Sequence, residues 1–397
     1  MLTLDNVYRA SQVLKNVARK TDVIYAPKLC PGADIYLKTE NLQVTGSFKV
    51  RGAYYKMSRL TEEEKARGVV ACSAGNHAQG VALAARENGI KAAICLPDGA
   101  PISKIEATKS YGAEVCLVPG VYDDAYNKAL ALRDERGYTF IHPFNDENVI
   151  AGQGTIALEI IDQLPNIDAV IVPIGGGGLI SGIAYTIKSI KPDVKVYGVQ
   201  AAGAPSMYKS VKDGEIRELE KVSTIADGIA VKKPGDLTYE ICSKYVDEIV
   251  TVTDDEISAA ILALMEQQKL VTEGAGAVSV AAAMFGKVDI KGKKTVCVLS
   301  GGNIDVTILS RVIKRGLLMS GRNCQLMIEL VDKPGQLESV AKIIASLGGN
   351  VTSVHHERAN EGSDVNGCYL RIILETRNFE HIEKIKSALA QAGFKLI

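Results

Sequence analysis

Tryptophan is absent from this chain of 397 residues, and aromatic residues make up only 5% of it. An excess of either charge is also missing, because 46 lysines and arginines balance 46 aspartates and glutamates. This balance argues against nucleic acid or an acidic surface as a partner. The hydrophobic content of 47% is ample for a large core, and the length predicts two or three domains.

Long uncharged segments are scarce as well. The longest spans residues 169–187, and Pro173 and five glycines interrupt it. Such a segment is more typical of a strand, a loop and a helix than of one spanning helix. No basic segment followed by an apolar run opens the chain, so we expect no secretory signal. The sequence therefore predicts a cytoplasmic protein without a membrane partner.

Cysteine is present but carries no recognisable spacing. There is no CxxC pair and no pattern typical of metal ligands, so we expect no metal site. Three of the cysteines lie in apolar, strand-like runs, where cysteine acts as a small hydrophobic residue. This usage is typical of a reducing compartment. The eight cysteines are Cys30, Cys72, Cys95, Cys116, Cys242, Cys297, Cys324 and Cys368.

Short apolar runs alternate with helical patterns through most of the chain. Helices separated by strands in this way predict βαβ units and parallel sheets covered on both faces. Ligands of such sheets bind at the carboxyl ends of the strands, so we expect the loops after Cys72, Pro173 and Leu299 to lie together. The predicted strands span residues 69–72, 92–96, 115–118, 138–141, 169–173, 195–199 and 295–299.

The pattern changes after Gly321. The order of predicted elements becomes strand, helix, strand, strand, helix, strand, which is a ferredoxin-like βαββαβ unit. The polar residues 320–323 separate the two patterns. We therefore expect one domain at residues 1–320 and a second at 321–397. The predicted elements of the second domain are 325–331, 336–347, 351–358, 369–375, 379–392 and 394–397.

Lys49 stands at the opening turn of a predicted helix, in the run Ser47-Phe48-Lys49-Val50-Arg51-Gly52. A lysine amine forms a Schiff base with a carbonyl when it is neutral part of the time. A partly apolar pocket, with Phe48 beside the amine, would lower the lysine pKa by desolvation. The alternative is a solvated surface lysine, because lysine is rarely buried.

Four consecutive glycines, Gly175-Gly176-Gly177-Gly178, follow a predicted buried strand and open a helix. Backbone N–H groups at a helix N-terminus bind phosphate, and glycine lets the backbone approach closely and adopt positive φ. A reactive lysine and a phosphate cradle are two needs of pyridoxal 5′-phosphate (PLP) chemistry. A dinucleotide fold is disfavoured, because Gly182 falls one residue late and Gln200 stands where an acidic residue is needed. The alternative is that the four glycines form a turn with a purely structural role.

Two further loops follow predicted strands. Ser73-Ala74-Gly75-Asn76 opens a helix and offers N–H groups to a substrate carboxylate. A second interpretation, compatible with the first, is that Ser73 or Asn76 simply caps that helix. His77 is expected to be structural. Ser300-Gly301-Gly302-Asn303 ends another strand, and the Ser300 hydroxyl could face a cofactor ring nitrogen or cap a helix. A neutral partner leaves that nitrogen largely unprotonated, which suits loss of a leaving group from Cβ.

Together the four loops resemble the threonine dehydratase (threonine ammonia-lyase) group of fold-type II PLP enzymes, over about residues 5–318. The resemblance implies two parallel-sheet subdomains, the smaller at about 41–141, with Glu273 near the pocket. It implies these cofactor contacts: Lys49 through a Schiff base, Phe48 on the ring, Asn76 at the ring hydroxyl, Gly175, Gly176, Gly177 and Gly178 at the phosphate, and Ser300 at the ring nitrogen. The implied substrate contacts are Ser73, Ala74, Gly75 and Gly228.

The second domain resembles an ACT domain, which binds amino acids at paired interfaces. The resemblance starts from the turn Asp332-Lys333-Pro334-Gly335, which is by itself a common turn. It implies an amino-acid effector with Gly335 and Asn350 as candidate contacts. A small ferredoxin-like unit also leaves sheet edges and one face uncovered, so we expect a homodimer or homotetramer.

The sequence thus predicts a lyase that converts L-threonine, and also L-serine, to a 2-oxo acid and ammonia, under allosteric control. A serine dehydratase or serine racemase on the same scaffold is the alternative. Serine racemases bind a divalent metal through acidic residues that follow one strand of this fold. In this chain that strand ends at Gln200, and Ala204 and Ser206 follow it in place of acidic residues. A divalent metal site is therefore not expected, and a monovalent cation site is the remaining alternative. A non-catalytic amino-acid sensor is a rival from another class, and Lys49 argues against it. A role in isoleucine biosynthesis or in threonine breakdown is not distinguished.

Overall fold

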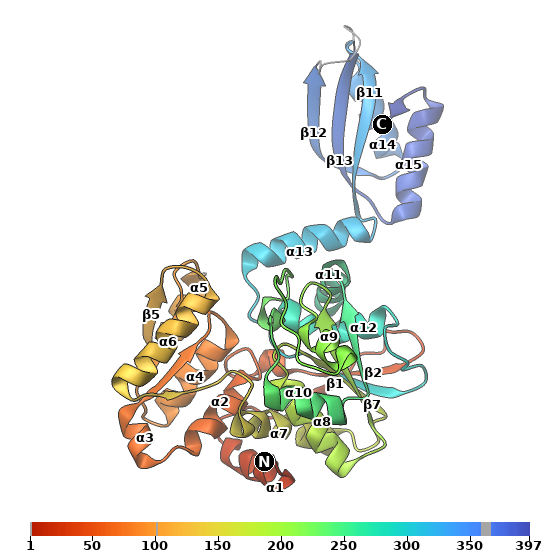
Figure 1. Cartoon of the computed structure of the whole chain (residues 1–397). Coiled ribbons are helices and arrows are strands. Elements are labelled where there is room, and N and C mark those ends of the chain that lie inside the picture. Colours follow the sequence, from red (N-terminus) through yellow and green to blue (C-terminus); the bar gives the residue numbers. More distant parts are fainter. Residues whose placement is uncertain (1, 101, 359–366) are drawn as a thin grey trace. The chain divides into compact units, whose positions relative to one another are not determined.

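The computed structural model describes residues 2–100, 102–358 and 367–397 (Figure 1). The described residues form two compact units, one that runs to Ile308 and one that spans Leu309–Ile397. The helix α13 (Val306–Met319) begins at this division and belongs mostly to the second unit. The domain boundary at residue 320 stays a prediction.

The larger sheet of the first unit has six strands in the order β1-β2-β10-β7-β8-β9. Neighbouring strands are parallel, except that β1 and β2 are antiparallel. Every residue of β7 is buried, which explains its wholly apolar sequence. The strands are β1 (Val23–Tyr25), β2 (Asp34–Lys38), β7 (Ala169–Pro173), β8 (Lys195–Ala201), β9 (Glu248–Val252) and β10 (Lys294–Val298).

Helices pack on this sheet from both faces. Val170 and Val172 of β7 share one core with the apolar residues of α7 (Glu147–Gln163) and α8 (Gly178–Ile190). On the other face Cys297 of β10 contacts the Ser279 carbonyl oxygen of α12 (Gly274–Met284) at 3.7 Å. Residues 274–283 of α12 are all buried, because small side chains let this helix lie close to the strands.

The smaller sheet has four parallel strands in the order β5-β4-β3-β6. The two sheets confirm the predicted α/β fold with two parallel-sheet subdomains. The strands are β3 (Val69–Cys72), β4 (Ala92–Pro97), β5 (Glu114–Val118) and β6 (Thr139–Phe140). The accompanying helices are α2 (Lys49–Ser58), α3 (Glu62–Arg67), α4 (Asn76–Glu87), α5 (Ile102–Ser110) and α6 (Tyr122–Arg136).

The second unit holds an antiparallel sheet in the order β12-β13-β11-β14, which confirms the predicted βαββαβ order. The helices that follow β11 and β13 lie on one side of the sheet, where they bury the alternate apolar residues of these two strands (Figure 1). The elements are β11 (Asn323–Val331), α14 (Gln336–Ser346), β12 (Asn350–Arg358), β13 (Gly367–Glu375), α15 (Phe379–Gln391) and β14 (Lys395–Leu396).

Several elements differ from the sequence-based expectation. The helical sequence pattern over residues 254–270 forms α11 (Asp254–Ala263) followed by a π-helical turn, Leu264–Gln268, which ends where Lys269 adopts φ 59°. Helices α1 (Leu4–Leu14), α9 (Ser206–Asp213) and α10 (Asp236–Tyr245) were not predicted. None of the helices in the described part of the chain combines the length and apolar character that crossing a bilayer requires.

Candidate active site

Lys49 begins helix α2 and lies where the strand β10 ends. The N–H of Phe48 donates to the Ser300 carbonyl oxygen at 3.2 Å, which ties this helix start to the loop after β10. The Lys49 amine is half-buried, donates to the Pro143 carbonyl oxygen at 3.1 Å, and lies 5.3 Å from the centre of the Phe48 ring. Burial lowers the pKa of Lys49 to about 8, although the Glu273 carboxylate opposes the shift. The amine is therefore not a solvated surface charge.

Arg51, two residues further along α2, anchors this helix in a buried charge network. Its guanidinium donates two hydrogen bonds of 2.8 Å to Glu40 and bonds of 2.6 and 3.0 Å to Glu159 of α7. Lys38 of β2 donates to the same Glu159 carboxylate at 2.6 Å. Arg51, Glu40 and Lys38 are at most 1% exposed. The network fixes the helix that carries Lys49 against the larger sheet.

The four glycines follow β7, and the last of them, Gly178, begins α8. Gly177 precedes α8 with φ 98°, and no side chain caps this helix. A Cβ on Gly176 would lie 2.4 Å from the Phe144 ring, and one on Gly177 would lie 2.7 Å from the side chains of Met207 and Thr238. Only glycine fits at these two positions, because a Cβ would clash with the surrounding side chains. The N-terminus of α8 therefore offers its backbone N–H groups to an anion.

Helix α7 joins the lysine to the glycines, because it packs backbone to backbone against both α2 and α8. A Cβ on Gly52 of α2 would lie 2.7 Å from the Val149 carbonyl oxygen, and one on Gly152 would lie 2.6 Å from the Arg51 carbonyl oxygen. A Cβ on Gly182 of α8 would lie 2.4 Å from the Ile150 carbonyl oxygen. These close contacts hold the starts of α2 and α8 at a fixed separation.

The loop after β3 forms a second uncapped helix start. Gly75 precedes α4 without a side-chain cap, while Ser73 Oγ accepts from the Gly75 N–H at 3.1 Å. The interpretation of Ser73 or Asn76 as a helix cap is therefore wrong. A Cβ on Gly75 would meet no atom within 4 Å, so the loop beside half-buried Ala74 faces open space. Its N–H groups suit a carboxylate.

Asn76 connects three loops through its side-chain amide. Its Nδ2 donates to Glu273 Oε1 at 2.6 Å, and its Oδ1 accepts from Asn303 Nδ2 at 2.8 Å. Asn303 also donates to the Thr45 carbonyl oxygen at 2.8 Å. The loops after β3 and β10 and the start of α12 thus meet at one place, as expected from the carboxyl ends of parallel strands.

Glu273 is the acidic group of the site, and only 4% of it is exposed. Burial raises the pKa of Glu273 to about 7, and the Asp227 carboxylate adds to the shift, while Lys104, Asn76 and Lys49 oppose it. A Cβ on Gly301 would lie 2.4 Å from its Oε1. Sequence reasoning placed Glu273 near the pocket only through the resemblance, because a glutamate before a small-residue helix is an ordinary pattern.

Ser300 is buried in the loop after β10. Its Oγ donates to the Ala275 carbonyl oxygen at 3.2 Å. The next helix along the chain, α13, begins only at Val306, so Ser300 does not cap a helix. Its hydroxyl is a neutral group beside the lysine loop, as a partner for a pyridine nitrogen requires.

Two histidines near Lys49, buried His77 and half-buried His142, have lowered pKa values. His77 Nε2 lies 2.8 Å from the Ile141 carbonyl oxygen, and burial lowers the pKa of His77 to about 3. Burial lowers the pKa of His142 to about 4, and its Nδ1 accepts the N–H groups of Phe144 and Asn145. The structural role expected for His77 fits this geometry, and Lys49 and Glu273 stay as the titrating pair.

Gly228 is exposed and lies in a single 3₁₀ turn, Asp227–Ile229, close to Glu273. A Cβ on Gly228 would lie 3.3 Å from Glu273 Oε1. The neighbouring Asp227 carboxylate accepts from Lys104 Nζ of α5 at 2.6 Å, so an ion pair links the smaller subdomain to this segment.

The end of β8 carries an amide in place of a carboxylate. The Gln200 side chain donates to the Ile174 carbonyl oxygen and accepts from the Tyr208 N–H.

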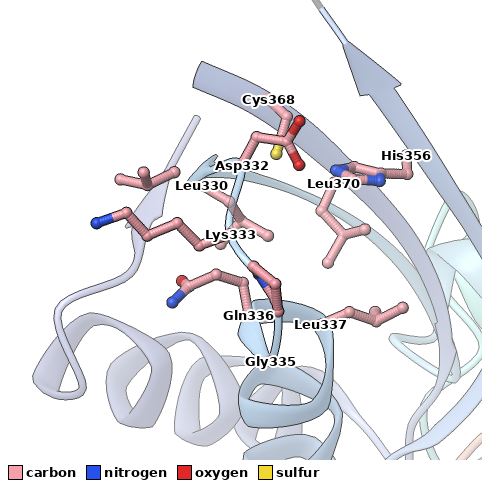
Figure 2. A pocket seen from close by; sticks show the side chains of 11 residues that line it. Leu330, Asp332, Lys333, Gly335, Gln336, Leu337, His356, Cys368 and Leu370 are labelled. Atoms are coloured by element: carbon pink, nitrogen blue, oxygen red, sulfur yellow. The ribbon is translucent and has the colours of Figure 1, made fainter. Parts of the chain in front are cut away.

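The predicted effector contacts lie apart within one chain. Gly335 precedes α14 with φ 86° and lines a cavity of about 430 Å³ in the second unit (Figure 2). Asn350 stands at the start of β12, where its amide donates to Glu375 at 2.8 Å, and it is not among the residues that line this cavity. A shared effector site of Gly335 and Asn350 stays a prediction.

Comparison with known proteins gives a consistent result. Residues 14–301 match the family model described as "Pyridoxal-phosphate dependent enzyme". An L-threonine ammonia-lyase of Thermotoga maritima is 51% identical over 398 residues, which cover 100% of this chain and 99% of the relative. The catabolic L-threonine dehydratase of Escherichia coli (strain K12) is 48% identical over 78% of this chain and 96% of its own length. The structure of threonine deaminase isoform 2 from Solanum lycopersicum superposes with a TM-score of 0.74 at 39% identity, covering 79% of this chain and 94% of that one.

Proposed function

Since this chain belongs to the family of pyridoxal-phosphate dependent enzymes, we propose that it dehydrates and deaminates L-threonine to 2-oxobutanoate and ammonia. L-serine, which differs from threonine by one methyl group, is proposed as a second substrate. The observation that carries the proposal is the half-buried Lys49 amine, held by α2 and α7 at a fixed separation from the uncapped glycine start of α8. The name of the full-length relative from Thermotoga maritima supports the choice of substrate.

The residues present fit pyridoxal phosphate. The glycine loop and the α8 N-terminus would hold the phosphate, the Phe48 ring would pack beside the pyridine, and the neutral Ser300 hydroxyl would face its nitrogen. Lys49 would bind the carbonyl carbon, and Asn76 would contact the ring hydroxyl. When bound, the cofactor supplies an electron sink for the bonds at the substrate Cα.

The chain's own groups then divide the remaining tasks. The N–H groups of the loop Ser73-Ala74-Gly75 bind the substrate carboxylate, and the Gly228 loop covers the substrate from the other side. Once the substrate amino group has displaced it from the carbonyl carbon, the Lys49 amine, whose pKa is lowered to about 8, takes the Cα proton. Glu273 holds the Asn76 amide in place, and its pKa of about 7 lets it bind or release a proton in the working range.

A turnover assay over a panel of amino acids tests this function. L-threonine should give 2-oxobutanoate, L-serine should give pyruvate, and borohydride should fix the cofactor to the peptide that contains Lys49. Fixation to any other lysine, or no 2-oxo acid from either substrate, would contradict the proposal. D-serine as the main product from L-serine would instead favour the racemase alternative.

The second unit is proposed to be an ACT-like regulatory domain. The alignment with the Escherichia coli relative covers 96% of that protein but only 78% of this chain. This difference supports a catalytic part that functions without the tail. We infer a homodimer or homotetramer in which paired tails bind an amino acid near Gly335 and Asn350, with isoleucine or valine as first candidates. Strands β12 and β14 are the sheet edges available for such pairing.

A chain that ends after Ser320 separates regulation from catalysis. The shortened enzyme should keep its turnover and lose its response to isoleucine and valine, because an effector acts only through unequal binding to two states. A full response in the shortened enzyme would place the effector site in the catalytic unit and contradict this role of the tail.

A further inference from the structure

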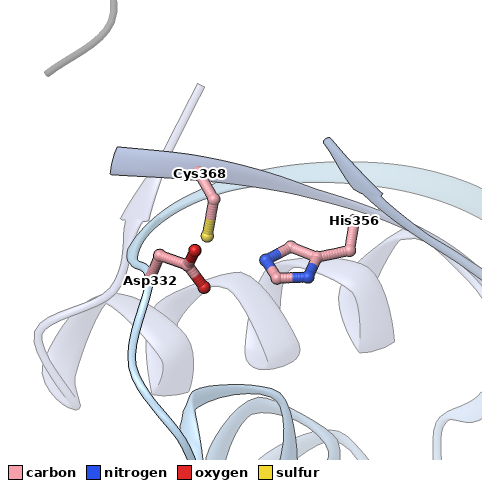
Figure 3. A group of neighbouring side chains, drawn as sticks. All are labelled: Asp332, His356 and Cys368. Atoms are coloured by element: carbon pink, nitrogen blue, oxygen red, sulfur yellow. The ribbon is translucent and has the colours of Figure 1, made fainter. Parts of the chain in front are cut away.

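Three metal-binding side chains gather at one end of the sheet in the second unit. The carboxylate of Asp332, the imidazole of His356 and the thiol of Cys368 point toward one another (Figure 3). One ligand atom from each residue lies within 4.8 Å of the ligand atoms of the other two. No local sequence pattern indicates this group, because its members come from a loop and two different strands.

The register of the sheet explains why they meet. Cys368 of the central strand β13 lies opposite Leu330 of β11, and Leu370 lies opposite His356 of β12. Cys368 and His356 are therefore diagonal neighbours on the same face, since alternate residues of a strand share a face. Asp332 follows the end of β11 and reaches the same place from the turn before α14.

We propose that Asp332, His356 and Cys368 bind one Zn²⁺ ion. Sulfur, imidazole nitrogen and carboxylate oxygen are the ligands that zinc prefers, in tetrahedral geometry. Bond lengths of about 2.0–2.3 Å place tetrahedral ligand atoms roughly 3.3–3.8 Å apart, which small side-chain rotations reach from the observed group. A thiolate and an imidazole exclude Ca²⁺ and Mg²⁺, which take oxygen ligands.

Among the residues that the structure describes, these three ligands leave a fourth coordination position open. All three ligands line the cavity of about 430 Å³, together with apolar side chains that include Leu330, Leu337 and Leu370 (Figure 2). Asp332 and His356 are exposed, so an ion reaches the site without opening the fold, whereas Cys368 is only 2% exposed and lies on the core side. Water, or the carboxylate of a small ligand in the cavity, would complete the tetrahedron.

Zinc binding by the full-length holoenzyme tests the proposal directly, without an assay of turnover. Competition with a chromophoric chelator should show one tight Zn²⁺ per chain. Co²⁺ in its place should give tetrahedral d–d bands at wavelengths longer than the cofactor absorption. His356→Gln and Asp332→Asn, which change exposed side chains, should each weaken binding roughly tenfold or more, as should Cys368→Ser.

Matched controls lie in the same unit. His355 is the neighbour of His356 on β12 and pairs with Arg371, so it faces the other side of the sheet, and Cys324 is a second buried cysteine. His355→Gln and Cys324→Ser should bind zinc as the wild type does. The proposal is overturned if the wild type binds no zinc, if His356→Gln and Asp332→Asn both bind it unchanged, or if His355→Gln loses it equally. Because His356→Gln and Asp332→Asn are surface changes, an unstable Cys368→Ser protein would not prevent this decision.

Discussion

The two units of this chain treat charge in opposite ways. The first unit buries Lys38, Glu40 and Arg51 at no more than 1% exposure, and its candidate site holds a lysine and a glutamate with shifted pKa values. In the described part of the second unit no lysine, arginine, aspartate or glutamate is buried. Buried charges need fixed partners, and fixed partners give the rigid geometry of a catalytic site.

The charged side chains of the second unit are not held by buried partners in this way. Its described lysine, arginine, aspartate and glutamate side chains are at least partly exposed, so they can change partners at little cost in desolvation when a ligand or another subunit arrives. The difference teaches that one chain can combine a preorganised unit with an adaptable one. Four substitutions test how far this contrast holds.

Lys49→Ala should have the largest effect. Removing the amine deletes both the cofactor anchor and the proton acceptor, so kcat for L-threonine should fall on the order of 10⁴-fold or more. The matched change in the second unit, Lys342→Ala at an exposed position, should leave kcat unchanged. Comparable losses in both variants would remove the distinction between the units.

Arg51→Met comes next. It leaves the Glu40 and Glu159 carboxylates without their guanidinium, and breaking a buried ion pair in this way costs about 3–5 kcal/mol of unfolding free energy. Arg371→Met removes the half-exposed pair with Glu357 in the second unit and should cost only about 0–1 kcal/mol. Denaturant unfolding measures both, and equal losses would contradict the contrast.

Glu273→Gln sharpens the comparison through pH. The folded-state pKa of Glu273 is raised to about 7 from an ordinary value of 4.5, so the folded protein holds more protons between these values. Its contribution to stability is therefore full below the ordinary pKa and declines as pH rises to about 7, by at most about 1.4 kcal/mol per pH unit. The variant should lack this decline. Parallel stability curves for variant and wild type would show that folding leaves the pKa of Glu273 unshifted.

Lys104→Met should have the smallest effect, because Asp227 is 61% exposed and the pair resembles those of the second unit. An exposed ion pair contributes about 0.2–1 kcal/mol, so kcat/KM should change no more than a few-fold at low salt. The difference from the wild type should vanish in concentrated salt. A large loss that persists in high salt would assign Lys104 a direct role in the reaction.

Local signals were enough to predict the parts of the site that belong to one short segment. The lysine at a helix start, the glycines after an apolar strand and the change of pattern after Gly321 are each visible over a few residues. The contacts that complete the site were not predictable in this way, because they join distant positions. Asn76 meets Glu273 across 197 residues, and Arg51 meets Glu159 across 108.

The same reasoning explains the elements that were missed. Strands β1, β2 and β9 are short and have mixed burial patterns, so no clear alternation marks them. The group of Asp332, His356 and Cys368 depends on strand register, which spacing along the sequence does not reveal. The alternatives of Ser73 and Ser300 as helix caps were decided only when the true helix starts were known.

The glycines between α2, α7 and α8 have a consequence for anyone who wants a more heat-resistant variant. Replacing a helical glycine by alanine ordinarily stabilises a protein by roughly 0.5–1 kcal/mol, so Gly52, Gly152 and Gly182 look like natural first choices. Here an added methyl group would meet backbone oxygens at 2.4–2.7 Å. Alanine substitutions chosen by helix propensity alone would push apart the helices that carry the lysine and the phosphate cradle. The distance between the two ends of the active site thus depends on glycines whose lack of a side chain lets these helices lie in close contact.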